Sequence, residues 1–378
     1  MKVLIAVTHL LGTGHLRRAL VLADAFAAAG HRVVLASGGM PLDVNVSKGV
    51  QLLQLPPLRS DGVNFSRLLD ETGAAAGETR IAARAALLRQ AVAELGPDVL
   101  ITELFPFGRR VLSAEFTALL QAAATLRPRP VVLSSVRDIL APPSKPSKAA
   151  RAEDLIASHY DAFLVHSDPE GTPLEQSWPL TDAMRSKLRY TGYVTQPPPG
   201  PHPDGAGTGE ILVSAGGGDV GDSIFETALA AARQMPETRW RLLVAGPAQR
   251  LASLRARASG GQVIVEPVRP DFRGLLANAA TSVSMCGYNT AMDVLQTRIP
   301  AVFVPFDAGN EVEQSLRADS LSHLSGIATL RERDLTADRL CAAIRDVAQA
   351  PRRAAGGLQF DGAARSVAIA TDMVKARR

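Results

Sequence analysis

A histidine follows a glycine-containing turn near the start of the chain, in the stretch HLLGTGHLRR at residues 9–18. The turn joins the apolar run VLIAV to an alanine-rich segment of helical period, so His15 is expected in the first turn of a helix. Free N–H groups and the positive dipole end there favour an anion and disfavour imidazolium, so His15 should stay neutral. This predicts a general base. A capping or merely exposed histidine is the alternative.

The same turn fits a dinucleotide-binding loop poorly. Gly12, Gly14 and Arg17 give G-x-G-x-x-R, which lacks the third glycine, and Ser37 stands where an acid should hold the ribose. We therefore do not expect NAD. Gly12 and Gly14 remain candidates for contact with an acceptor or its phosphate.

A second glycine loop, VSAGGGDVGDS at residues 213–223, lies between a strand and a helix of the second half. Three successive glycines, Gly216, Gly217 and Gly218, allow the backbone to approach a phosphate closely. No Lys-Ser or Lys-Thr pair follows, so the loop is not of the Walker type.

Polar residues cluster in SMCGYNTAMDVLQTRIPAVFVPFDAGNEVEQ, residues 284–314. Gly287 permits a turn after a strand expected to end at Cys286, and Asp293 on the following helix is suited to accept hydrogen bonds from two sugar hydroxyls. The next strand is expected to end at Phe306. The polar residues expected to face a sugar are Asn289, Thr290, Asp307, Asn310, Glu313 and Gln314. Ordinary capping and surface polarity are the alternative for each one alone.

Charged residues also follow three strands of the first half, where a doubly wound sheet keeps its site. They are Glu103, Arg109, Arg110, Arg137, Asp138, His166 and Asp168. Arginine offers a planar fork for phosphate or carboxylate groups, which suggests acceptor binding by Glu103, Arg109, Arg137 and Asp138. An ion pair between Glu103 and Arg109 that fixes a loop is an equal alternative, and Arg137 beside Asp138 is open to a structural role.

Length and composition limit the class of protein. The chain has 378 residues, 46% of them hydrophobic and 21% charged, which favours two well-packed domains. Two cysteines, neither in a metal-ligand spacing, fit a reducing cytoplasm. The net charge of +4 is too diffuse for nucleic-acid binding. We expect no cleaved leader and no transmembrane helix, and leave open a peripheral contact with the inner face of the membrane.

Short β-branched runs alternate with alanine- and leucine-rich helical stretches, as in βα units around a parallel sheet. The expected strands are KVLIAV, RVVLAS, PDVLIT, PVVLSS, AFLVHS, EILVSAGGG, WRLLVAG, QVIVEPV, TSVSMC and PAVFVPF. We predict an α/β protein with two Rossmann-like doubly wound domains facing each other across a cleft. The first domain spans 1–195 and the second spans 210–378. Residues 196–209 form a Pro/Gly-rich linker that is expected to bury nothing. Packing of the last helix back on the first domain is left open.

Both halves resemble the GT-B glycosyltransferases, specifically the MurG-like family 28 and a subgroup of predicted glycosyltransferases. GTGHL matches the glycine-rich turn of that family, which closes on a histidine, and CGYNTAMDVLQTRIPAVFVPF with Gln314 matches its carboxy-terminal signature. The resemblance implies that the first domain binds the acceptor and the second the donor, with Asp293 on the ribose and Gln314 on the sugar. This chain has Asp293 where the family usually has Glu, and Glu313 in place of the first Gln of a pair. The donor-binding set is assigned as Gly216, Gly217, Gly218, Arg269, Gly287, Asn289, Thr290, Asp293 and Gln314.

The predicted activity is an inverting transfer of a hexose or N-acetylhexosamine from a nucleotide diphosphate sugar, UDP-linked, to a hydroxyl acceptor that is lipid-linked or a small metabolite. No Asp-x-Asp occurs in the sequence, so we expect a metal-independent reaction with no cofactor, in which helix N-termini stabilise the departing diphosphate. A UDP-sugar hydrolase or epimerase of the same fold, and a non-catalytic nucleotide-sugar binder, are the alternatives.

Overall fold

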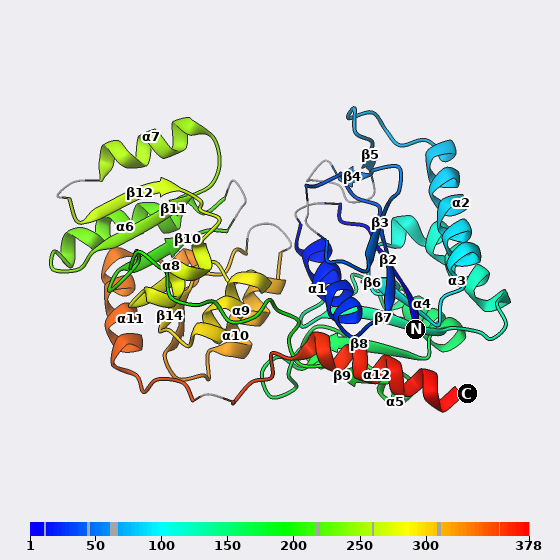
Figure 1. The fold of residues 1–378 in the computed structure, drawn as a ribbon. Coiled ribbons are helices and arrows are strands. Elements are labelled where there is room, and N and C mark those ends of the chain that lie inside the picture. The colour runs from blue at the N-terminus through cyan, green and yellow to red at the C-terminus, as the bar shows by residue number, and fades with distance from the viewer. Residues whose placement is uncertain are drawn as a thin grey trace. The chain divides into compact units, whose positions relative to one another are not determined.

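The computed structural model describes residues 1–10, 13–43, 46–60, 67–216, 220–258, 261–307, 311–354 and 356–377. The chain divides into two compact units (Figure 1). Unit 1 contains residues 1–195 and 359–378, and unit 2 contains residues 196–358. The last helix therefore belongs to the first unit although it follows the second in sequence.

Unit 1 is built on a seven-stranded parallel sheet with the strand order β3-β2-β1-β6-β7-β8-β9. Its strands are β1 (Lys2–Val7), β2 (Arg32–Ser37), β3 (Val50–Gln54), β6 (Val99–Glu103), β7 (Val131–Arg137), β8 (Ala162–His166) and β9 (Leu188–Tyr190). A small antiparallel pair, β4 (Arg59–Ser60) and β5 (Leu68–Leu69), lies outside this sheet. The central strands are nearly continuous apolar runs because helices cover both faces of the sheet.

Two apolar cores, one on each face, hold unit 1 together. On one face α1 (Gly14–Ala28) and α12 (Gly362–Arg377) pack side by side against the sheet (Figure 1). On the other face lie α2 (Glu78–Leu95), α3 (Ser113–Thr125) and α4 (Pro146–His159). The short α5 (Asp182–Lys187) completes the unit. This arrangement places the start of α1 directly after β1, at the carboxyl edge of the sheet.

Unit 2 repeats the design with a six-stranded parallel sheet of order β12-β11-β10-β13-β14-β15. Its strands are β10 (Ile211–Ser214), β11 (Trp240–Val244), β12 (Val263–Pro267), β13 (Thr281–Ser284), β14 (Ala301–Phe303) and β15 (Ile327–Thr329). Its helices are α6 (Asp222–Gln234), α7 (Ala248–Arg257), α8 (Phe272–Asn278), α9 (Tyr288–Thr297), α10 (Glu313–Leu321) and α11 (Ala337–Gln349). The prediction of two doubly wound parallel-sheet domains is confirmed.

The structure adds elements that the sequence patterns did not reveal. Strands β3, β9 and β15 were not predicted because they are short and lie toward or at the sheet edges, where the apolar signal is weak. Strands β13 and β14 end at Ser284 and Phe303, earlier than the expected Cys286 and Phe306.

Residues 196–209, expected to bury nothing, pack on unit 2. His202 is buried, with its Nε2 2.9 Å from Asp271 Oδ2, and Asn278 donates to the Ala206 carbonyl oxygen at 2.9 Å. Gly207 approaches Leu275 so closely that a Cβ there would lie 2.6 Å from its carbonyl oxygen. The backbone and one histidine supply the contacts that large apolar side chains do not.

A buried arginine on α2 ties together the carboxyl ends of three strands. Arg84 pairs with Glu115 through Nε and Nη2, each at 2.7 Å, and both side chains are completely buried. Its remaining N–H groups donate to Thr8 Oγ1 and to the carbonyl oxygens of Gly38 and Pro56. Gly38 has to lack a side chain, because a Cβ there would lie 2.4 Å from the guanidinium.

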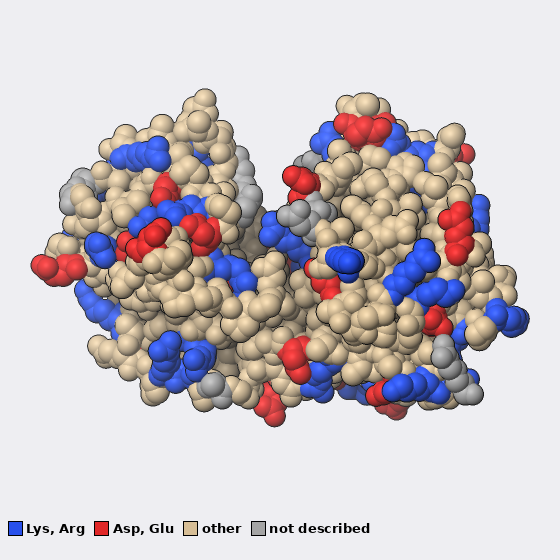
Figure 2. All heavy atoms as spheres, viewed as in Figure 1, with Lys and Arg blue, Asp and Glu red and all other residues tan. Residues whose placement is uncertain are grey.

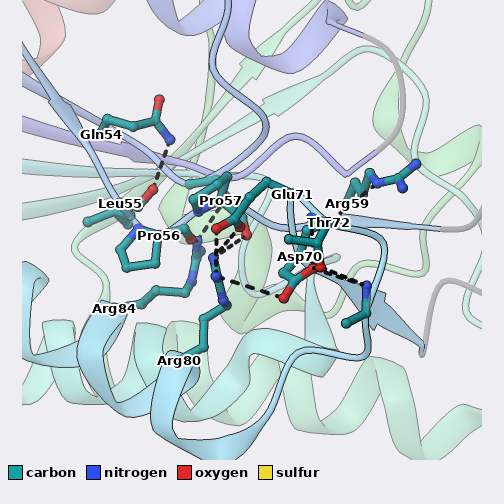
Figure 3. Close-up of polar contacts among 12 residues, drawn as sticks. Gln54, Leu55, Pro56, Pro57, Arg59, Asp70, Glu71, Thr72, Arg80 and Arg84 are labelled. Atoms are coloured by element: carbon teal, nitrogen blue, oxygen red, sulfur yellow. Dashed lines mark hydrogen bonds and ion pairs between the residues drawn. The ribbon is translucent and has the colours of Figure 1, made fainter.

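Arg80, one turn earlier on α2, forms a similar ion pair that is more exposed to solvent (Figure 3). Arg80 pairs with Glu71 at 2.7 Å and donates to the Pro57 carbonyl oxygen at 3.2 Å. Both arginines thus reach the segment that follows β3, but only Arg84 is removed from water. Surface pairs contribute little to stability, whereas a broken buried pair leaves an uncompensated charge.

Charge on the surface is mixed. On the face drawn in Figure 2, basic and acidic side chains are interspersed among uncharged ones. Within the described part of the chain, no helix is long and apolar enough to cross a membrane. Cys286 and Cys341 are both buried.

Replacing Arg84 by Met should lower the free energy of unfolding by about 3–5 kcal/mol, because Glu115 keeps a buried charge without its partner. Urea denaturation of the full chain, with Trp240→Phe so that Trp178 alone reports on unit 1, measures this loss. Arg80→Met is the matched control and should leave the unfolding midpoint nearly unchanged. Equal unfolding midpoints for the two variants would contradict the conclusion that the buried Arg84–Glu115 pair stabilises unit 1.

Candidate active site

The side chain of His15 meets a carboxylate at the carboxyl edge of the unit 1 sheet. Gly14 and His15 begin α1, whose preceding residue, Thr13, makes no capping hydrogen bond with its side chain. Glu103 is the last residue of β6, which pairs with β1. His15 Nδ1 lies 2.9 Å from Glu103 Oε1, so the first turn of α1 and the end of β6 are joined by this contact.

Glu103 is buried and has three side-chain partners. Arg18 forms an ion pair with Oε1, and Ser135 Oγ donates to Oε2 at 2.6 Å. Arg18 is three residues after His15 and therefore projects from the same side of α1. Its Nη2 also lies 3.1 Å from His15 Nδ1. The carboxylate is thus surrounded by donors.

These surroundings shift both pKa values. The pKa of His15 is lowered to about 3, mainly by burial and also by the charges of Arg109 and Arg18, while the hydrogen bond to Glu103 opposes the change. Burial alone would raise the pKa of Glu103, but the charge of Arg18 and the hydrogen bonds from His15 and Ser135 bring it well below its usual range. The neutral state expected for His15 therefore has burial, rather than the helix dipole, as its largest cause.

The protonation states follow from these shifts. An ionised carboxylate cannot donate, so His15 Nδ1 must carry the hydrogen of its bond to Glu103. In the described part of the chain, His15 Nε2 has no hydrogen-bond partner. The imidazole therefore presents a lone pair at Nε2 and can accept a proton there.

The other acceptor-side candidates have separate surroundings. Glu103 forms its ion pair with Arg18, whereas Arg109 donates from Nε to the Thr8 carbonyl oxygen at 2.6 Å and has a left-handed backbone, with φ of 60°. Arg137 ends β7 and the adjacent Asp138 is completely buried. Gly12 lies outside the described residues.

Two residues that contact Glu103 were missed from sequence. Arg18 was not singled out from the sequence, although its spacing of three from His15 was a usable signal. Ser135 lies opposite Glu103 in the register of β6 and β7, which only the strand pairing reveals. His166, one of the charged residues noted after the strands, is completely buried and lies with Nε2 2.9 Å from Ser135 Oγ.

In unit 2 the second glycine loop follows β10. Gly216 has a φ of 76°, a conformation that suits glycine, and Gly217 and Gly218 lie outside the described residues. Helix α6 begins after Gly221, which is also left-handed. The loop therefore leads into a helix N-terminus, as the sequence predicted.

The residues of the carboxy-terminal signature surround the start of α9. Gly287 is the N-cap of this helix, and Asn289 and Thr290 lie in its first turn. Asp293 Oδ1 accepts a hydrogen bond from Arg273 Nε at 2.7 Å. Burial raises the pKa of Asp293, and the charge of Arg273 opposes this. The carboxylate is therefore already engaged by an arginine from α8.

Arg269 and Gln314 are also engaged within unit 2. Arg269 pairs with Asp271 at 2.6 Å and with Glu266 at 3.4 Å, and Gln314 Oε1 accepts from the backbone N–H of Phe306 at 3.2 Å. These contacts fix the segments that follow β12 and β14. Arg273, which the sequence patterns did not single out, connects α8 to α9 through its contact with Asp293.

Comparison with known proteins identifies the two halves. Residues 13–183 match the family described as Glycosyl transferase 4-like domain, and residues 213–365 match the Glycosyltransferase family 28 C-terminal domain. The chain is a GT-B glycosyltransferase with a type 4-like amino-terminal domain and a family 28 carboxy-terminal domain. The resemblance drawn from the sequence is confirmed, with the addition that the first half matches a type 4-like domain.

Several relatives and solved structures are similar to this glycosyltransferase. The UDP-N-acetylglucosamine--N-acetylmuramyl-(pentapeptide) pyrophosphoryl-undecaprenol N-acetylglucosamine transferase of Phenylobacterium zucineum is 27% identical over 94% of this chain and 92% of the relative. Acinetobacter baumannii MurG has a TM-score of 0.62 at 15% identity, covering 98% of this chain and 99% of the other. The UDP-GlcNAc 2-epimerase of Methanocaldococcus jannaschii has a TM-score of 0.61 at 11% identity, with 98% and 100% covered. The two structural likenesses concern the fold.

The free energy of unfolding should fall as the pH decreases below 6.5. Burial lowers the pKa of both His15 and His166 to about 3, so in this range the unfolded chain takes up protons that the folded chain does not. Each of these two histidines then contributes a loss of about 2 kcal/mol between pH 7 and pH 5.

Urea denaturation at the two pH values, for the native chain and for His166→Gln, measures the contribution of His166. The variant should lose about 2 kcal/mol less than the native chain over this interval, since the histidines common to both cancel. The same pH dependence in both proteins would contradict burial of a neutral His166.

Proposed function

We propose that the chain catalyses an inverting, metal-independent transfer of a hexose or N-acetylhexosamine from a UDP-sugar to a hydroxyl acceptor. The contact between His15 and ionised Glu103 supports this proposal most strongly, because it orients the neutral imidazole with its hydrogen on Nδ1 and leaves the lone pair at Nε2 to accept a proton. The sequence contains no Asp-x-Asp, the common device for chelating a metal on the donor diphosphate. A single displacement with inversion requires one base and a stabilised leaving group.

In the proposed reaction His15 Nε2 removes the proton of the acceptor hydroxyl as its oxygen attacks the anomeric carbon. The bond between that carbon and the diphosphate oxygen breaks, and the nucleoside diphosphate leaves with the electron pair. Glu103 stabilises the imidazolium formed at His15, as carboxylates do in other catalytic pairs. Gly14, Arg109, Arg137 and Asp138 are proposed to contact the acceptor or its phosphate.

The donor is proposed to bind unit 2. Backbone N–H groups of Gly216, Gly217 and Gly218, and the helix N-terminus that follows Gly287, would stabilise the departing diphosphate. We assign Asp293 to the ribose, through the oxygen that Arg273 does not use. Arg269, Asn289, Thr290 and Gln314 complete the donor-binding set.

The choice of UDP and an N-acetylhexosamine as donor rests on the relatives, whose name states a UDP-N-acetylglucosamine donor. That name also states an undecaprenol-linked acceptor. For this chain we propose a hydroxyl acceptor, lipid-linked or a small metabolite, reached by an enzyme at the inner face of the membrane or free in the cytoplasm. Thermal-shift measurement with UDP, dTDP, GDP and their sugars tests the nucleotide directly.

Incubation with UDP-N-acetylglucosamine and a panel of hydroxyl acceptors distinguishes the transferase from other enzymes of the same fold. UDP release that depends on an acceptor supports a transferase. Rapid UDP release without an acceptor indicates a hydrolase, and formation of an epimeric UDP-sugar indicates an epimerase. Binding of UDP with no turnover in any assay indicates a non-catalytic binder. Each of the last three results contradicts the proposal.

Replacement of His15 by Ala should lower kcat by about 10²–10⁴-fold, because the acceptor then loses its general base. The KM for the nucleotide sugar should change little, since His15 belongs to unit 1 and the donor is assigned to unit 2. Steady-state kinetics of acceptor-dependent UDP release measure both constants.

His31→Ala is the matched control for this variant. His31 precedes β2 at the amino edge of the same sheet, where it contacts the terminal amine, and its replacement should leave kcat unchanged. A native kcat in the His15→Ala protein would remove His15 from the mechanism.

A further inference from the structure

A row of buried polar side chains crosses four neighbouring strands at the carboxyl edge of the unit 1 sheet. It runs from Glu103 on β6 to Ser135 on β7, His166 on β8 and Thr191 directly after β9. The distances are 2.6 Å from Ser135 Oγ to Glu103 Oε2, 2.9 Å from His166 Nε2 to Ser135 Oγ, and 2.9 Å from His166 Nδ1 to Thr191 Oγ1. All four side chains are at least 98% buried.

Counting hydrogens gives the row a direction. Ser135 has one hydroxyl hydrogen, and it must donate to Glu103, because an ionised carboxylate only accepts. The lone pairs of Ser135 and His166 Nε2 cannot face each other at 2.9 Å, so Nε2 must carry a hydrogen and donate to Ser135. The tautomer of His166 is thereby fixed by the carboxylate of Glu103, which acts through Ser135.

The same reasoning extends to the end of the row. Burial lowers the pKa of His166 to about 3, so the ring is neutral near pH 7 and its Nδ1 is an acceptor. Thr191 Oγ1 lies 2.9 Å from Nδ1, and its single hydroxyl hydrogen is shared between Nδ1 and the Gly192 carbonyl oxygen at 2.7 Å. The hydrogens of Ser135 and His166 Nε2 thus point toward Glu103, and such chains strengthen each member by polarisation.

We propose that Ser135 and His166 are positioning residues, which hold Glu103 ionised and in one orientation and thereby keep His15 as the tautomer with its hydrogen on Nδ1. This inference rests on the proposed function only where it concerns catalysis. Neither residue touches a substrate atom in this account. They act on the reaction through Glu103 and His15 alone.

Other charged groups face this pair and enter the prediction. Arg18, from α1, pairs with Glu103 Oε1, and Arg109 acts on His15 through its charge. Both disfavour a protonated His15, whereas Glu103 favours it. Loss of the Ser135 hydroxyl leaves Arg18 and Arg109 in place but makes Glu103 a stronger acceptor. The pKa of His15 should therefore rise.

The test compares Ser135→Thr with Ser135→Val in the full chain. The two variants have nearly the same shape and differ by the hydroxyl, so packing costs cancel between them. Nitrogen NMR of ¹⁵N-histidine-labelled protein reports the tautomer and titration of His15 and His166 without any substrate. Signals are assigned with His15→Gln and His166→Gln.

The threonine variant should keep the native pattern, with His15 protonated at Nδ1 and His166 at Nε2. The valine variant should show mixed tautomers of His166 and a His15 titration midpoint at higher pH. Identical tautomers and midpoints in both variants would overturn the proposal. If the valine variant does not fold, Ser135→Ala replaces it, with the same expected result.

A kinetic measurement completes the test. The valine variant should have a kcat on the order of 10-fold below that of the threonine variant, with an unchanged KM for UDP-sugar and an acid limb of the kcat profile moved to higher pH. If Ser135 had only a structural role, its replacement would not shift the acid limb of the kcat profile. An unshifted acid limb together with equal kcat values in the two variants would contradict the proposal. The two proposals can be refuted separately. A fully active His15→Ala variant would refute the role of His15 as general base, whereas the NMR comparison would still test whether Ser135 and His166 set the tautomer of His15.

Discussion

The charge of Glu103 in the interior of unit 1 is the constraint on which the rest of the site depends. A buried carboxylate costs several kcal/mol unless a partner charge and hydrogen bonds offset its lost hydration. Arg18 supplies the charge, and His15 and Ser135 supply the hydrogen bonds. Burial keeps His15 neutral, and the charges of Arg18 and Arg109 further disfavour a positive charge on the imidazole. The hydrogen bond to Glu103 orients the neutral ring.

The two units use arginines in different ways. In unit 1, Arg84 and Arg109 share Thr8, one through its hydroxyl and the other through its carbonyl oxygen, so the end of β1 is held immediately before the first glycine turn. In unit 2, Arg269 and Arg273 are paired with nearby acids, and the buried Arg317 donates to the Cys286 carbonyl oxygen at 2.9 Å. The arginines of unit 2 thus shape the loops, and the proposed recognition of the diphosphate is left mainly to backbone amides.

The sequence was sufficient for the architecture and for part of the site. Ten predicted strands, the helix that begins near His15 and the glycine loop at Gly216 follow from local pattern, because buried parallel strands and strand-to-helix turns leave strong signals. The side chains that contact Glu103 could not be predicted from local pattern. Ser135 lies beside Glu103 through strand register, and Arg18 reaches Glu103 from α1, a different element from β6. Local pattern contains neither kind of information. For the same reason the pairing of Asp293 with Arg273 was missed, since the two side chains come from different helices.

Replacement of Glu103 by Gln tests the central claim most directly. The substitution keeps the shape of the side chain but removes its charge and allows its amide to donate toward His15 Nδ1, which would place the imidazole hydrogen on Nε2. Acceptor-dependent UDP release should then fall by at least about 100-fold, while calorimetric titration shows unchanged affinity for the nucleotide sugar and confirms that unit 2 is intact. A Glu103→Gln enzyme that transfers sugar at the native rate would contradict the account.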